Sequence, residues 1–271
     1  LVAVNHLEGH IHAVLLEARM TGGAEPEFPA VTLVVSGGHT HLYKVDQDGE
    51  NGLLQYDRIG RTRDDAAGEA YDKVAKLLAL GYPGGPVIDQ LAPHGNPQAV
   101  SFSRPKMMKG NALDFSFSGI KTAVLYYVRD EGLDAEAEER KQWRRQQAPN
   151  PGMEELRGQM SAKTLDLVAS FQRAVVDDLV SRTLKAADVT DERSQIRSIM
   201  VSGGVASNRE LRERFSQEAP RRGYPVFFPS PALSTDNAAM IAAAGYPKLR
   251  AGRLARDEET AAASLPLGAP L

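Results

Sequence analysis

The stretch IRSIMVSGGVASNRELRERFSQEA, residues 196–219, combines the features that indicate the fold class. Residues 196–202 are a short apolar run typical of a buried strand, and the two glycines after Ser202 form a turn. The charged residues 209–219 then predict a helix. A strand that passes through a glycine turn into a helix is the repeating unit of α/β proteins, so this segment predicts an α/β fold.

The rest of the chain continues this alternation of strands and helices. We expect further strands at 31–36, 39–45 and 53–59 and in residues 224–231, and an extended stretch at 113–118. We expect helices at 6–18, 64–80, 86–92, 119–130, 163–187 and 234–249. Asp64 is expected to be the N-cap of its helix. The alternation again favours the α/β class.

The composition limits the classes of protein to consider. The 271 residues, 42% hydrophobic and 25% charged, suffice for one large domain or two lobes. The absence of cysteine excludes disulfides, thiolate metal ligands and cysteine nucleophiles, and it fits a cytoplasmic location. No apolar run approaches the length of a membrane span. The net charge of −3 gives no overall basic field, so contact with nucleic acid needs a local patch or a partner.

His6 and His10 lie four residues apart in the first expected helix. At about 100° per residue both side chains project from one face, close enough to share a metal ion. The pattern differs from a zinc peptidase helix, because Glu8 lies two residues after His6 and roughly 200° around the helix from it. Two interpretations stay open: a metal-binding pair, or two ordinary core or surface histidines.

The tripeptide Ser-Gly-Gly follows a strand twice, at 36–38 and at 202–204. Glycines in this position let backbone N–H groups approach an anion, and a following helix N-terminus adds partial positive charge. The second turn opens a helix and has the better geometry for a phosphate. We expect two lobes that hold one nucleotide, although either turn alone is also typical of a hairpin or a corner.

Three carboxylates complete the candidate site. Asp236 begins a helix of small residues, where it is either an N-cap or a third metal ligand beside the two histidines. Asp72 and Asp89 flank the glycines at 84 and 85, where carboxylates can accept hydrogen bonds from ribose hydroxyls.

Residues 131–163 are strongly charged and have little apolar periodicity, so we expect an exposed insertion, part helix and part disordered. Within it RKQWRRQQ, residues 140–147, holds four basic residues and Trp143. These side chains can contact nucleic-acid phosphates and stack on a base, but a solvated insertion is the simpler interpretation.

Six stretches together resemble the tRNA N6-adenosine threonylcarbamoyltransferase family (bacterial type), formerly known as O-sialoglycoprotein endopeptidases or glycoproteases. They are NHLEGHIHA (5–13), VSGGHTHL (35–42), DDAAGEAYDKVAKLLALGYPGGP (64–86), FSFSGIKTAV (115–124), VSGGVASNRELR (201–212) and STDNAAMIA (234–242). They occur in the family's order over nearly the whole chain. The resemblance implies the two-lobed actin/hexokinase/Hsp70-like (ASKHA) fold with RNase H-like lobes and a nucleotide in the cleft between them.

The resemblance also implies the site residues. The metal ligands would be His6, His10 and Asp236, holding one divalent iron or zinc ion. The substrate loop would comprise Val34, Val35, Ser36, Gly37 and Gly38, and the adenylate would contact Asp72, Gly85, Asp89 and Asn208. ATP is expected to fit the same cleft.

The implied activity is transfer of the threonylcarbamoyl group from threonylcarbamoyl-AMP to N6 of the adenosine 3′-adjacent to the anticodon, in tRNAs that read codons beginning with A. The amine would attack the carbamoyl carbonyl and AMP would leave, so no protein nucleophile is required. The implied partners are tRNA, a non-catalytic paralogue subunit and a small ATPase, with no membrane. A separate enzyme would make the adenylate. A metallopeptidase and a non-catalytic ATP-binding scaffold are the alternatives.

The same resemblance gives an expected division of the chain. Residues 1–95 would be the remainder of the first lobe, residues 96–250 the second lobe with the charged insertion at 131–163, and residues 251–271 a C-terminal tail. The chain begins at Leu1 without the family's N-terminal segment, so we expect part of the first lobe to be missing. The charged insertion is also longer than the family pattern.

Overall fold

The computed structural model describes all residues except 50–51, 103–110, 148–151, 257–259, 263–264 and 269–271. The strands are β1 (Ala30–Val35), β2 (Thr40–Gln47), β3 (Leu54–Arg61), β4 (Ser198–Ser202) and β5 (Val226–Phe227). The helices of the first half are α1 (His6–Thr21), α2 (Ala67–Leu77), α3 (Gly84–Leu91), η1 (Ala92–His94), α4 (Ser118–Asp130), α5 (Leu133–Gln146) and α6 (Met153–Gly158). The later helices are α7 (Ala162–Ser194), η2 (Gly204–Ser207), α8 (Arg209–Arg221), α9 (Pro231–Ser234) and α10 (Ala238–Arg250).

The strands form one mixed sheet in the order β3-β2-β1-β4-β5. β1, β2 and β3 form antiparallel pairs, whereas β1 with β4 and β4 with β5 are parallel. The sheet therefore takes strands from both sides of residue 95, the boundary expected between two lobes. The division of the chain into lobes at that position stays a prediction.

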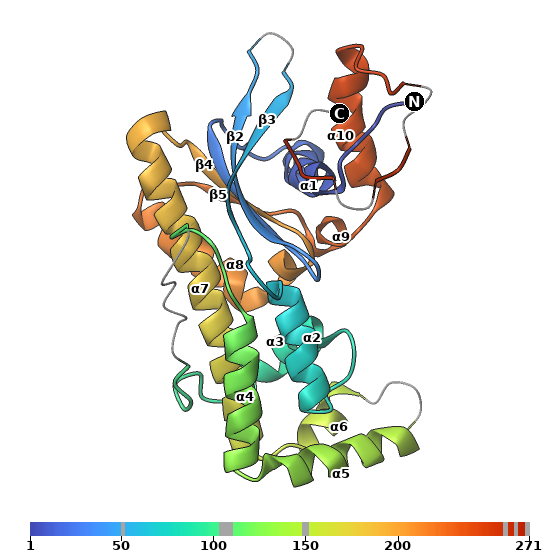
Figure 1. Ribbon diagram of the computed structural model, residues 1–271, viewed down its shortest axis with the longest axis vertical. Coiled ribbons are helices and arrows are strands. Elements are labelled where there is room, and N and C mark those ends of the chain that lie inside the picture. Colours follow the sequence, from blue (N-terminus) through green and yellow to red (C-terminus); the bar gives the residue numbers. More distant parts are fainter. Residues whose placement is uncertain (50–51, 103–110, 148–151, 257–259, 263–264, 269–271) are drawn as a thin grey trace.

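The central strand β1 is buried on both faces because its side chains alternate between two cores. Leu33 and Val35 belong to the larger core, which includes α7, and Val34 belongs to the smaller core with Leu7 and Ile11 of α1. Figure 1 shows α7 on one side of the sheet and α1 with α10 on the other, while α2 to α6 extend beyond one end of the sheet. This packing fixes α1 on one face of the sheet, against β1 and β4.

The segment expected to be an exposed insertion is helical over α5 and α6 and partly buried. Trp143 is partly buried against the larger core, which argues against the alternative in which its ring stacks on a base. Arg140 is only 1% exposed, and its guanidinium donates to the backbone oxygens of Leu78 (2.8 Å) and Gln159 (3.0 Å). Most of the other described residues of 131–163 are exposed, as expected, and the burial of Arg140 is the departure: its backbone partners allow a charged side chain to be buried.

Asp64 is not the N-cap of the helix that follows it. α2 begins at Ala67 with Ala66 in the N-cap position. Asp64 instead accepts hydrogen bonds from the backbone N–H groups of Phe117 (2.8 Å) and Ser118 (3.2 Å) at the start of α4. The carboxylate caps a helix that is distant in sequence, which local sequence patterns cannot reveal.

Within the described ranges, none of the helices combines the length and the apolar character needed to cross a membrane.

Candidate functional site

α1 presents two imidazole rings on one face. The helix begins after Asn5, whose side chain accepts a hydrogen bond from the N–H of Leu7 (3.0 Å), and Glu8 completes a capping box. His6 and His10 follow one turn apart, and their rings meet edge to face with centroids 4.9 Å apart. The well-capped first turn therefore fixes both rings at the start of the helix.

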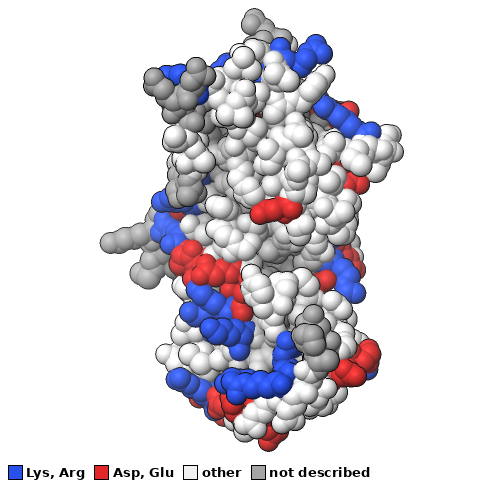
Figure 2. Space-filling model, turned by 90° about the vertical axis from the view of Figure 1, so that its right-hand side faces the viewer, with Lys and Arg blue, Asp and Glu red and all other residues white. Residues whose placement is uncertain are grey.

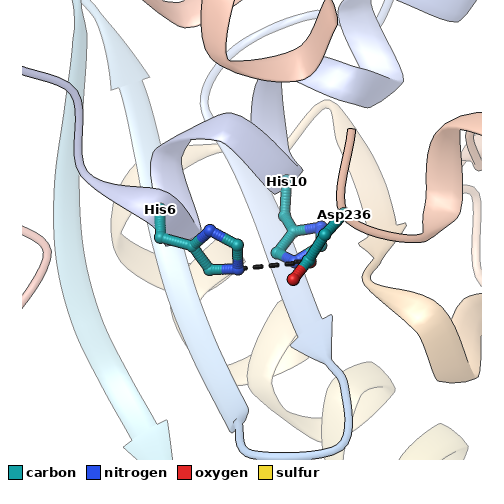
Figure 3. Close-up of side chains that lie close together, drawn as sticks. All are labelled: His6, His10 and Asp236. Carbon is teal, nitrogen blue, oxygen red and sulfur yellow. Dashed lines mark ion pairs between the residues drawn. The ribbon is translucent and has the colours of Figure 1, made fainter. Parts of the chain in front are cut away.

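Asp236 lies between α9 and α10 and faces both rings (Figure 3). Its Oδ1 is 3.3 Å from His6 Nε2 and 3.2 Å from His10 Nε2. The N-cap of α10 is Asn237, which accepts a hydrogen bond from the N–H of Met240 at 2.8 Å. Asp236 is therefore not an N-cap, and its carboxylate is left for the histidines.

The three side chains, which we call the His-His-Asp group, offer ligand atoms that all lie within 4.8 Å of one another. His10 is 1% exposed, and its ring nitrogens have no hydrogen-bond partner among the described residues apart from the 3.2 Å contact of Nε2 with Asp236. Burial, followed by the neighbouring His6 ring, lowers the pKa of His10. A neutral, buried imidazole with unpartnered nitrogens is suited to a metal ion.

Glu8 points away from the His-His-Asp group, as its helical position predicts. The buried carboxylate accepts hydrogen bonds from Lys248 Nζ (2.6 Å) and the Tyr56 hydroxyl (3.4 Å). A glutamate held in this ion pair is not placed as a general base beside the histidines, which argues against the metallopeptidase alternative.

Both Ser-Gly-Gly turns lie at the same edge of the sheet. They follow the carboxyl ends of β1 and β4, which are neighbouring parallel strands. Among the described residues one sheet supplies both turns, and the expected division of the chain into two lobes stays a prediction. Gly203 has φ +92°, and a Cβ there would lie 2.3 Å from the backbone oxygen of Val35. Glycine at 203 is what lets the second turn pass so close to β1.

A cavity of about 610 Å³ opens beside the two turns; we call it the adenylate cavity, after the ligand expected there. It is lined by Gly37, Gly68, Tyr71, Asp72, Pro83, Gly85, Pro86, Asp89, Gln90, Gly204, Val205, Ser207, Asn208, Arg209 and Thr235. Five of these were predicted from the sequence: Gly37, Asp72, Gly85, Asp89 and Asn208. Thr235 directly precedes Asp236, so the His-His-Asp group borders this cavity.

The other residues of the predicted substrate loop are not part of the cavity lining. Val34 and Val35 lie in β1 with fully buried side chains, and Ser36 and Gly38 lie outside the set of lining residues. The backbone oxygen of Ser36 accepts a hydrogen bond from the N–H of Gly68 at 3.2 Å. This contact holds the start of α2 against the first turn.

The predicted polar residues of the cavity already have partners within the protein. Asp72 accepts a hydrogen bond from the N–H of Gly84 at 2.7 Å. Asp89 accepts hydrogen bonds from the N–H (3.1 Å) and Nε (3.0 Å) of Arg209. Asn208 is the N-cap of α8. These side chains position the cavity walls as well as facing the space between them.

Two hydroxyl groups of the cavity lining have no partner in the described part of the chain. The oxygens of Tyr71 and Ser207 are buried without a hydrogen bond. Burial raises the pKa of Tyr71 well above its usual value, so the hydroxyl stays protonated and can donate. Neither residue was predicted from the sequence. For Tyr71 the reason is that a tyrosine in an amphipathic helix has the pattern of an ordinary core residue.

His39, directly after the first glycine turn, was not among the predicted site residues. Burial, followed by the charge of His6, lowers the pKa of His39. Its position directly after the first glycine turn is a signal that was available in the sequence.

The family model described as tRNA N6-adenosine threonylcarbamoyltransferase matches residues 1–243. A protein of that name from Koribacter versatilis is 50% identical over 279 residues, covering 98% of this chain and 71% of the relative. One from Syntrophotalea carbinolica is 48% identical over 252 residues, covering 93% of this chain and 62% of the relative. The chain thus spans less than two thirds of most of the first curated relatives that it matches.

A solved structure shares the fold. The crystal structure of full-length HypF in the phosphate- and nucleotide-bound form aligns with a TM-score of 0.54 at 12% identity, covering 92% of this chain and 42% of that protein. The α/β class and the ASKHA fold expected from the sequence are confirmed.

Proposed function

The chain belongs to the tRNA N6-adenosine threonylcarbamoyltransferase family, and we propose that the protein transfers a threonylcarbamoyl group from threonylcarbamoyl-AMP to N6 of an adenosine in tRNA. The acceptor is the adenosine 3′-adjacent to the anticodon in tRNAs that read codons beginning with A. One observation carries the proposal: a cavity of nucleotide size is bordered by a His-His-Asp group, with Thr235 and Asp236 joining the two.

The cavity residues bind the adenylate in this proposal. Gly85 and Gly204 leave room for a phosphate or sugar to approach the backbone closely. Asp72 and Asp89 accept hydrogen bonds from ribose hydroxyls with the lone pairs that their present partners leave free. The unpartnered Tyr71 and Ser207 hydroxyls donate to the ligand. ATP fits the same cavity.

The His-His-Asp group fits one divalent metal ion. Two imidazoles and one carboxylate are ligands for zinc or iron and leave coordination positions open, and the buried His10 nitrogens lack other partners. A metal ion bound there would neutralise charge on phosphate and carbonyl oxygens of the adenylate.

The reaction needs no covalent bond to the protein. The adenosine N6 forms a bond to the carbamoyl carbon, the bond from that carbon to the phosphate oxygen breaks, and AMP leaves while N6 loses one proton. The contribution of this chain is to hold the adenylate in place beside the incoming amine. We propose that the paralogue subunit, the small ATPase and a separate adenylate-forming enzyme assist the protein.

Mass spectrometry of tRNA nucleosides tests the proposal. The full-length protein, with its partners and pre-made threonylcarbamoyl-AMP, should form threonylcarbamoyl-adenosine, and His6→Ala should form little. His94→Ala is the matched control, because His94 is an exposed histidine outside both the cavity and the His-His-Asp group. Absence of product with the wild-type protein, in an assay in which another transferase is active, would contradict the proposal.

A further inference from the structure

A second cavity, of about 640 Å³, lies next to the adenylate cavity; we call it the basic cavity. It is lined by Glu69, Asp72, Lys73, Lys76, Ala79, Gly81, Tyr82, Lys141, Arg144 and Arg145. Asp72 lines both cavities, and the neighbours Tyr82 and Pro83 each line one. Only Asp72 and the Tyr82–Pro83 segment therefore lie between the two cavities for a ligand that occupies both.

The basic cavity concentrates positive charge in a chain whose net charge is −3. Its lining holds five Lys or Arg residues and two carboxylates. Figure 2 shows Lys and Arg side chains gathered toward the lower end of the molecule, the end that holds α2 and α5 in Figure 1. A chain without an overall positive charge needs a local basic patch to bind nucleic acid, and this cavity supplies one.

The basic wall is held in place by α5. Arg140 is buried with its backbone partners, and one turn later Arg144 donates to the backbone oxygen of Leu80 at 2.6 Å. These bonds connect α5 to the chain just after α2, so the two halves of the cavity keep their relative position. A preformed charged surface loses less conformational entropy when it binds a ligand.

Two cations of this wall are available to a ligand. Lys73 pairs with Asp65 and Glu69, but Lys76 and Arg145 are exposed and form no ion pair with a described residue. Such side chains can contact the phosphates of a nucleic acid directly and release the counterions that were bound there, which favours binding.

An aromatic ring lies beside these cations. Tyr82 is 84% exposed, whereas Trp143 of α5 is packed against the larger core. Exposed aromatic side chains beside a basic groove are used by proteins to stack unpaired bases. This combination favours a nucleic acid over an acidic protein as the ligand.

We propose that the basic cavity binds the phosphate backbone of the tRNA and that Tyr82 stacks on an unpaired base. The tRNA is thereby held so that its acceptor adenosine reaches the adenylate cavity. This inference rests on the proposed function, because it deepens the account of how the acceptor is bound.

The test measures tRNA affinity against salt concentration with the full-length protein. The double variant Lys76→Glu, Arg145→Glu should bind tRNA at least tenfold more weakly at about 0.1 M salt, and its salt slope should fall by about 2. Tyr82→Ala should weaken binding about tenfold with an unchanged slope, because stacking is not ionic. The matched control is Lys185→Glu, Arg221→Glu, which reverses two exposed charges outside both cavities and should change affinity less than threefold.

AMP affinity checks that each variant is folded, because AMP binds in the other cavity. If the Lys76, Arg145 variant bound tRNA like the Lys185, Arg221 control while the wild type still formed modified adenosine, this inference would fail and the proposed function would stand. A wild type that binds tRNA in the basic cavity but forms no product would instead contradict the proposed function.

Discussion

The His-His-Asp group and the adenylate cavity border each other, but their polar side chains differ in how they are bonded. His6, His10 and Asp236 contact chiefly one another, and the buried His10 has no hydrogen-bond partner in the described structure. Asp72 and Asp89 each hold a backbone N–H of a neighbouring segment. Among the described residues the first group makes few bonds to neighbouring segments, whereas the carboxylates of the second group already stabilise the fold.

This difference separates ligand binding from stability. Removing an exposed member of the His-His-Asp group should reduce ligand binding and leave the free energy of unfolding nearly unchanged. Removing a cavity carboxylate should reduce both, because a backbone N–H then loses its acceptor. Three substitutions test this contrast.

The largest effect on transfer is expected for Asp236→Ala. The variant should no longer bind the metal, and its transfer rate should fall at least about a hundredfold. Replacing residues that only hold a metal ligand in place already lowers metal affinity or activity about 10–100-fold. Its free energy of unfolding without metal should change by less than about 0.5 kcal/mol, because the side chain is 75% exposed. Metal analysis, nucleoside analysis and urea unfolding measure these quantities. Asp130→Ala, an exposed aspartate at the end of α4, is the control and should change none of them.

Asp89→Ala should lower both stability and activity. The variant removes the acceptor of the Arg209 N–H at the start of α8, which should cost about 1 kcal/mol of unfolding free energy, and transfer should fall about tenfold. Asp89→Asn keeps one acceptor oxygen and should recover part of the stability. Urea unfolding combined with steady-state kinetics checks this, and an Asp89→Ala protein as stable as the wild type would remove the contrast between the two regions.

Tyr71→Phe should have the smallest effect on activity and the opposite effect on stability. The hydroxyl is buried without a partner, so its removal should raise the unfolding free energy by about 1 kcal/mol. AMP affinity should fall a few-fold because the ligand loses a donor. Thermal unfolding and calorimetry measure the two changes; a loss of stability would mean that the hydroxyl has a structural partner.

The sequence predicted the fold where the signal is local. The run at 196–202, the glycine turns and the helical spacing of His6 and His10 give the α/β order, and the structure confirms that order. The candidate ligands His6, His10 and Asp236 also came together as the family resemblance implied, although their role stays a proposal.

The errors concern contacts between distant parts of the chain. Asp64 caps α4 rather than its own helix, and Arg140 is buried because the backbone at Leu78 accepts its hydrogen bond. Whether the buried hydroxyl of Tyr71 has a hydrogen-bond partner likewise depends on which groups surround it in space. A pattern along the sequence carries no information about such partners.

We propose that the His-His-Asp group and the adenylate cavity act as one site, and calorimetry with AMP and Zn²⁺ tests this coupling most directly. AMP affinity of the full-length protein is measured with zinc and after its removal by a chelator, and zinc affinity is measured with and without AMP. Each ligand should tighten binding of the other by the same factor, about tenfold, and Asp236→Ala should abolish this coupling. Equal AMP affinity with and without bound zinc would contradict it.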